Sequence, residues 1–97
     1  MTDVDRLQKA IRGLHGLEPY HCASVRVHEV FKGETVWTGI VEVFEVHHPK
    51  AKYAYAWSYK DDNEKSHYVA VLGVPPVNSA EDAVRAYIVA QAEKKGL

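Results

Sequence analysis

Near the start of the chain, hydrophobic and polar positions alternate with the period of a helix. The apolar residues near the start of the chain share one helical stripe: Val4, Leu7, Ile11 and Leu14. Thr2 and Asp5 have a spacing like that of a capping box, and Gly13 and Gly16 can end the helix. The sequence therefore predicts one amphipathic helix before Pro19, which forces an extended exit.

Four strand-like runs follow, at about 21–31, 35–46, 53–59 and 67–74. The first alternates apolar and polar residues, as in a half-buried strand, whereas the second is apolar on both parities. Lys32-Gly33-Glu34 predicts a hairpin between them, and Gly39 indicates a bulge or a close backbone approach. The polar segment 60–65 predicts an exposed turn, and Pro75-Pro76 ends the sheet because proline has no backbone donor.

A second helix is predicted from Ser79, with Asp82 as its capping partner and Gly96 as its stop. Its inner stripe contains Ala83, Val84, Tyr87 and Ile88. Because every connection between strands is too short for a parallel crossover, the strands are expected to form an antiparallel meander. The predicted fold is a single α+β domain over residues 1–97. Its order is α-β-β-β-β-α, with a four-stranded sheet and two helices packed on one face.

The third strand carries a regular row of rings. Large and small side chains alternate, so one face carries four rings that we call the aromatic stripe: Tyr53, Tyr55, Trp57 and Tyr59. The other face, with Ala54, Ala56 and Ser58, is flat enough for a helix to lie close against it. The aromatic stripe is therefore expected to stay open, as an interface or a ligand surface, unless it forms ordinary core.

Charge and composition narrow the classes of partner. The chain has a net charge of −1 and a pI of about 6.6, with 46% apolar and 26% charged residues, as in an ordinary globular domain. Nucleic-acid binding is not expected, because phosphate contacts need a clustered excess of Lys and Arg. The second helix opens Ser79-Ala80-Glu81-Asp82, and this acidic start would repel phosphate.

Metal binding and membrane insertion are not expected either. Cys22 is the only cysteine, so an intramolecular disulfide and a thiolate metal cluster are excluded. Of the six histidines, His47 and His48 are adjacent, and neighbours in extended chain diverge. We expect no metal and no cofactor. The acidic start and the lack of about 18 consecutive apolar residues predict no signal peptide, no membrane span and a cytoplasmic location.

No motif for nucleophilic catalysis is present. The serines lie in no Gly-x-Ser-x-Gly elbow, and no glycine loop is suited to phosphate. Cys22 and His21 are neighbours on a strand and should point apart. His67 and Glu42 form the best acid–base pair that the sequence offers. Enzymatic activity is left open, and a non-catalytic domain is favoured.

Several short motifs resemble a small family of uncharacterised bacterial proteins. They are Val36-Trp37-x-Gly39-x-Val41-Glu42-Val43-Phe44, His48-Pro49-x-Ala51 and Tyr55-Ala56-Trp57. Domains of this size and type are often encoded by mobile gene cassettes. The resemblance covers most of the chain, but it implies no activity and transfers no site.

Three functions remain. We expect a non-catalytic binding or self-association module, which forms a homodimer through the aromatic stripe. The alternative is a small-molecule-binding protein with an aromatic pocket, in which Trp37 joins the aromatic stripe around a planar or cationic ligand and Glu42 supplies the opposite charge. An enzyme with an unrecognised site is the third.

Overall fold

The structure is a computed structural model that describes residues 3–94. Its elements are α1 (Asp3–His15), β1 (Tyr20–Phe31), β2 (Glu34–His48), β3 (Ala51–Lys60), β4 (Ser66–Leu72) and α2 (Ala80–Lys94). The strands form one antiparallel sheet in the order β1-β2-β3-β4. The predicted α+β fold and its element order are thus confirmed. The expected helix cap at Thr2 and stop at Gly96 lie outside the described residues.

Local signals explain where the elements begin and end. Lys32 and Gly33 both have positive φ, 53° and 80°, as a two-residue type I′ turn requires, and they join β1 to β2 as predicted. At the start of α2, the backbone N–H of Asp82 donates to Ser79 Oγ over 3.1 Å. The Asp82 carboxylate in turn accepts from the N–H of Asn78 over 3.2 Å. The predicted cap of the second helix is confirmed.

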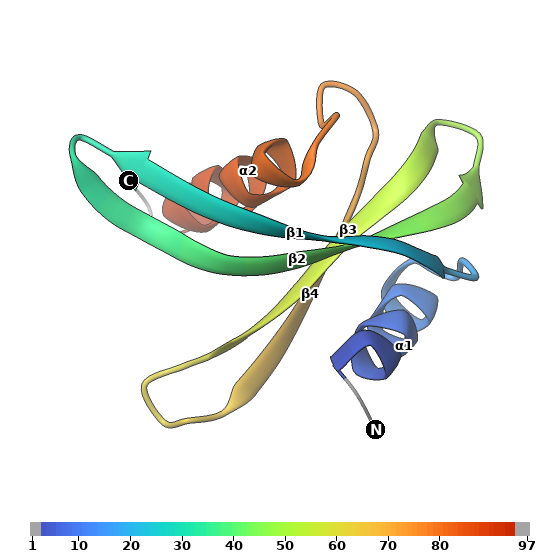
Figure 1. Ribbon diagram of the computed structural model, residues 1–97, viewed down its shortest axis with the longest axis horizontal. Coiled ribbons are helices and arrows are strands. Elements are labelled where there is room, and N and C mark those ends of the chain that lie inside the picture. The colour runs from blue at the N-terminus through green and yellow to red at the C-terminus, as the bar shows by residue number, and fades with distance from the viewer. Residues whose placement is uncertain (1–2, 95–97) are drawn as a thin grey trace.

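The two helices lie on opposite faces of the sheet, as Figure 1 shows. Leu7 and Ile11 of α1 pack on the small-residue face, against Ala54 and Ala56 among others. Ala83 and Val84 of α2 belong to the core cluster of the other face, with Val27, Val41, Tyr55 and Trp57. The prediction that both helices share one face is wrong, because both faces of the sheet are apolar and each is buried by its own helix.

The aromatic stripe is consequently the floor beneath α2 and is not an open surface. Trp57 is 1% exposed and Tyr55 is 5% exposed, while Tyr53 and Tyr59 are half-buried against the same cluster. The uncovered part of the sheet lies instead on the β1–β2 hairpin, on the α1 side. Exposed Arg26 pairs there with Ile40, which is 43% exposed.

The two hairpins of the sheet diverge like the arms of a fork. Pairing between β2 and β3 extends from His48↔Ala51 only as far as Glu42↔Ala56. Beyond that point β2 pairs only with β1, and β3 pairs only with β4. Figure 1 shows the two hairpins separating, with α2 above them. A register shift between Glu45 and His48 lies at the other end of the β2–β3 pairing, beside the turn.

Within residues 3–94, neither helix has both the length and the apolar character needed to cross a bilayer.

Candidate functional site

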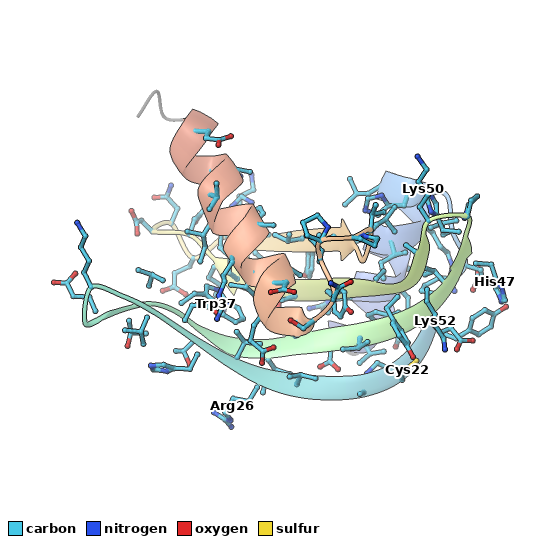
Figure 2. All side chains as sticks on the ribbon, turned by 90° about the horizontal axis from the view of Figure 1, so that it is seen from above. Cys22, Arg26, Trp37, His47, Lys50 and Lys52 are labelled. Carbon is cyan, nitrogen blue, oxygen red and sulfur yellow. The ribbon has the colours of Figure 1, made fainter. Side chains whose placement is uncertain are left out.

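A hollow of about 390 Å³ lies where the sheet forks. The sheet supplies Trp37 from β2 and Trp57, Tyr59 and Lys60 from β3. The roof is the later part of α2, which supplies Val84, Tyr87, Ile88 and Gln91. We call this space the aromatic hollow. Figure 2 shows Trp37 on β2 beside α2. Its size is within the usual range for small-molecule sites, about 300–1,000 Å³.

Aromatic contacts hold the walls of the aromatic hollow in place. Trp57 is the buried floor, and its ring lies edge-on to Trp37 at 5.9 Å between centroids and to Tyr87 at 5.6 Å. Trp37 and Tyr87 are only partly buried, so they present ring surface to the hollow. Edge-to-face pairs of this kind are favourable beyond their buried area. These contacts fix the relative positions of the rings that line the aromatic hollow.

Gly39 shapes the aromatic hollow through its missing side chain. The β1–β2 register runs regularly through Gly39, so the first of the two predicted alternatives, a bulge, is not found at this residue. The register shifts of this pair leave Cys22 of β1 and Val36 of β2 without a partner residue. A Cβ atom at Gly39 would lie 2.9 Å from the Trp37 ring. The close approach at Gly39 is thus made by an indole, which lies across this glycine and toward Trp57.

Two hydrogen-bonded pairs, linked by a ring stack, lie in and behind one wall of the aromatic hollow. The hydroxyls of Tyr59 and Tyr87 are 3.3 Å apart. Burial, and then the hydrogen bond with Tyr59, raise the pKa of Tyr87 to about 12. The other side of Tyr59 stacks on His67 at 5.1 Å, and His67 Nε2 is 2.8 Å from Asp61 Oδ2. This bond to His67, followed by the N–H of Lys65, lowers the pKa of Asp61.

Glu42 lies on the other face of the sheet, away from the aromatic hollow. Glu42 is two residues from Phe44 on β2, so it points to the same face as Phe44, which packs against α1. Its Oε1 atom is 2.8 Å from His21 Nε2 and also accepts the hydroxyl of Ser24. The prediction that Glu42 supplies charge beside the rings is wrong, because alternate residues of β2 point to opposite faces.

The cluster of Glu42, His21 and Ser24 contains the residue types of a hydrolytic triad but not its arrangement. In a triad the histidine lies between the acid and the nucleophile, so that it can remove the hydroxyl proton. Here the carboxylate lies in the middle, and both His21 and Ser24 bond to the same oxygen. The arrangement does not activate Ser24.

The other predicted site residues are divided between different places. Tyr55 is buried beside the start of α2, and burial raises its pKa. Half-buried Tyr53 has Lys52 Nζ 5.5 Å from its ring centre, and neither tyrosine lines the aromatic hollow. His67 and Glu42 are on opposite faces, so the predicted acid–base pair is wrong.

The sequence did not identify the part of the aromatic hollow that comes from α2. Tyr87, Gln91 and the rim residue Lys60 were not predicted as site residues. A signal for Tyr87 was present, because its spacing from Ala83 and Val84 placed it on the inner stripe of the helix. An aromatic residue beyond the well-packed part of such a stripe is a reasonable candidate for the wall of a pocket.

A shallower hollow of about 590 Å³ lies at the β2–β3 turn, and its lining includes His47, Lys50 and Lys52. Figure 2 shows these three residues at that end of the sheet, far from Trp37. His48 Nδ1 is engaged there, because it accepts the backbone N–H of Lys50 over 3.0 Å. Across residues 3–94, no three His, Cys, Asp or Glu side chains are grouped so that they could hold a metal ion.

Comparisons of the chain with models of protein families, with curated protein sequences and with solved structures give no significant match. The resemblance to a small family of uncharacterised bacterial proteins stays an expectation from the sequence pattern.

Proposed function

We propose that this protein is a non-catalytic binding domain that takes up a small planar molecule in the aromatic hollow. The observation that carries the proposal is the fork of the sheet, which leaves four aromatic residues around a space roofed by α2. Flat, rigid rings offer much apolar contact area and lose little side-chain entropy on binding. A planar ligand that displaces water from this space gains burial on several sides.

The test uses the two tryptophans, both of which line the aromatic hollow. In ¹H–¹⁵N spectra their two indole N–H signals report on the site directly. We expect saturable shifts of both signals on titration with planar probes such as 2-naphthoate, 2-naphthamide and 2-naphthamidine. Absence of saturable shifts for all three probes at millimolar concentration would overturn the proposal.

A matched pair of variants locates the binding site. Trp37→Ala removes a wall of the aromatic hollow, so we expect weaker probe binding, followed through the remaining Trp57 signal. Tyr20→Ala removes an exposed ring outside the hollow, so binding should be unchanged. Equal loss of affinity in both variants would show that the probes do not bind in the hollow.

Self-association is the second candidate, and the β1–β2 hairpin favours it. Val36 and Ile40 of β2 are 46% and 43% exposed, and β1 is a twelve-residue edge strand. Unpaired edges and exposed apolar residues invite pairing with a second copy. Light scattering after size-exclusion chromatography, over a range of concentrations, tests this. A dimer that Ile40→Lys converts to monomer would support it, and a monomer at every concentration would contradict it.

A further inference from the structure

We infer that the aromatic hollow selects a planar ligand that carries an anionic, acceptor-rich group such as a carboxylate. This inference rests on the proposed function, and it concerns the chemistry of the ligand. The preference for an anion is argued from two observations: the identity of the polar groups around the aromatic hollow, and the positions of the nearby carboxylates.

Among the residues that the structure describes, the lining of the aromatic hollow contains one charged side chain, and that side chain is a cation. Lys60 comes from the end of β3, and the other residues of the lining with polar side-chain groups are Tyr59, Tyr87 and Gln91 and the two tryptophans, whose indole N–H groups are donors. Lys60 Nζ has Glu64 at 3.9 Å, but their side chains are 65% and 85% exposed. An exposed pair of this kind is weak, so Lys60 can turn toward a ligand anion at little cost.

Two carboxylates near the aromatic hollow, Asp61 and Glu29, each have a hydrogen-bond partner within the protein. Asp61 bonds to His67, as described above. Glu29 is buried and lies 2.9 Å from Arg85 Nε of α2. Glu42, which could have attracted a cation, lies on the other face. A cationic ligand would therefore meet Lys60, and the carboxylate beside it, Glu64, is 85% exposed and is not part of the lining.

The two tyrosine hydroxyls add a hydrogen-bond donor. When one hydroxyl of the Tyr59–Tyr87 pair donates to the other, the acceptor hydroxyl keeps its own proton. That proton can be donated to an oxygen of a ligand. The pKa of Tyr87 is raised to about 12, and its hydroxyl is protonated at neutral pH, as an ordinary tyrosine hydroxyl also is. A hydrogen bond from a neutral hydroxyl to a charged oxygen is stronger than one to a neutral oxygen.

Aromatic rings also attract cations, and this alternative has less support here. Cation–π attraction needs an open ring face. Trp57 is 1% exposed, and one face of Tyr59 is covered by His67, whose ring lies 16° from parallel to it. The open ring surface of the aromatic hollow comes mainly from Trp37 and Tyr87, beside Lys60.

Three probes of nearly equal shape test the inference: 2-naphthoate is an anion, 2-naphthamide is neutral and 2-naphthamidine is a cation. We expect 2-naphthoate to bind about threefold to tenfold more tightly than 2-naphthamide, and 2-naphthamidine to bind most weakly. The preference should decrease at high salt, because Lys60 is exposed. If the amide or the amidine binds as tightly as the acid, the inference is wrong while the proposed function stands. If no probe binds, the proposed function itself fails.

Two variants assign the preference to the residues named. Lys60→Met and Tyr87→Phe should each reduce the preference for acid over amide by about twofold to fivefold, while 2-naphthamide affinity changes little. Lys50→Met makes the same change of net charge at the β2–β3 turn and should leave the preference intact. A preference that survives both Lys60→Met and Tyr87→Phe, or that Lys50→Met reduces equally, would overturn the assignment.

Discussion

The surroundings of Tyr87 favour the protonated form of its hydroxyl. Burial and the bond with Tyr59 raise its pKa to about 12 from an ordinary value near 10. The folded state therefore retains this proton more strongly than the unfolded state does. Its contribution to stability is complete below pH 10 and is lost as the pH rises from about 10 to 12.

A titration followed by NMR of ¹³Cζ-labelled tyrosine checks this. We expect a midpoint near 12 for Tyr87, and a lower one in Tyr59→Phe that stays above 10, because the burial remains. The exposed Tyr20 lies outside the aromatic hollow, so Tyr20→Phe should not move the Tyr87 midpoint. An unchanged Tyr87 midpoint in Tyr59→Phe would show that the two hydroxyls do not interact in solution.

Asp61 organises the turn between β3 and β4. Its Oδ1 accepts the N–H groups of Asn63 and Lys65 at 2.9 and 3.0 Å, and Oδ2 is bonded to His67. Since these bonds lower its pKa from 3.8, the carboxylate stabilises the folded state above that pH. The stabilisation is lost as the pH falls below 3.8 through the lower folded pKa.

Asp61→Asn should therefore be less stable than the wild type at pH 7, and the two should converge as the pH falls toward 2. Urea unfolding between pH 2 and pH 7 measures the difference. Asp62→Asn, in the same exposed turn, is the matched control and should be close to the wild type throughout. A difference between wild type and Asp61→Asn that is constant over this pH range would contradict the interpretation.

At the scale of elements, replacing a glycine by alanine should change the free energy of unfolding in opposite directions at Gly73 and Gly13. A Cβ atom at Gly73 would lie 2.9 Å from the carbonyl oxygen of Tyr53 and 3.0 Å from the Tyr55 ring, and the Gly73 N–H already donates to that carbonyl. Gly73→Ala should cost about 1–3 kcal/mol, because backbone must move. Gly13 lies in α1 with nothing within 4 Å of such an atom. Gly13→Ala should add about 0.5–1 kcal/mol.

Urea unfolding of both variants measures these changes in the free energy of unfolding. The two changes should have opposite signs. Both substitutions add the same methyl group, so a difference in sign must come from the surroundings of each glycine. If Gly73→Ala proved neutral, β4 would not approach β3 as closely as the structure has it.

The elements themselves could be predicted because their signals are local. The cap at Ser79, the turn at Lys32 and Gly33, and the periodicity of each run depend on neighbours in sequence. The placement of the helices depends instead on which face each connection leads to. Leu7 and Ile11 fit the flat surface of Ala54 and Ala56. No local sequence signal, however, indicates that α2 packs on the opposite face.

The same distinction explains the partial prediction of the site. Trp37, Trp57 and Tyr59 were identified because their chemistry is visible in the sequence. Tyr53 and Tyr55 are on the same face of β3 as Trp57 and Tyr59, but they do not line the aromatic hollow. The hollow opens only where β2 and β3 separate. The hairpins separate beyond the Glu42↔Ala56 pair, and where two twisted hairpins separate depends on the whole sheet, which residue patterns do not encode locally.

At the scale of the whole molecule, the aromatic hollow exists only when three elements are assembled. β2 supplies Trp37, β3 supplies Trp57 and α2 supplies Tyr87, so the unfolded chain has no corresponding site. A ligand that binds only the folded state must raise the free energy of unfolding. The expected gain is about 2.7 kcal/mol at a free concentration of one hundred times Kd.

We expect 2-naphthoate at this concentration to raise Tm by roughly 10–20 °C, since about 1 kcal/mol corresponds to about 4–8 °C in a domain of this size. Differential scanning calorimetry at increasing probe concentration measures the shift. Trp37→Ala should lose most of the shift, because it removes one wall without removing the buried floor at Trp57, whereas Tyr20→Ala should retain it. A shift of equal size in Trp37→Ala would mean that the probe stabilises the protein from elsewhere on its surface. The fork would then be a consequence of sheet twist alone, with no role in binding.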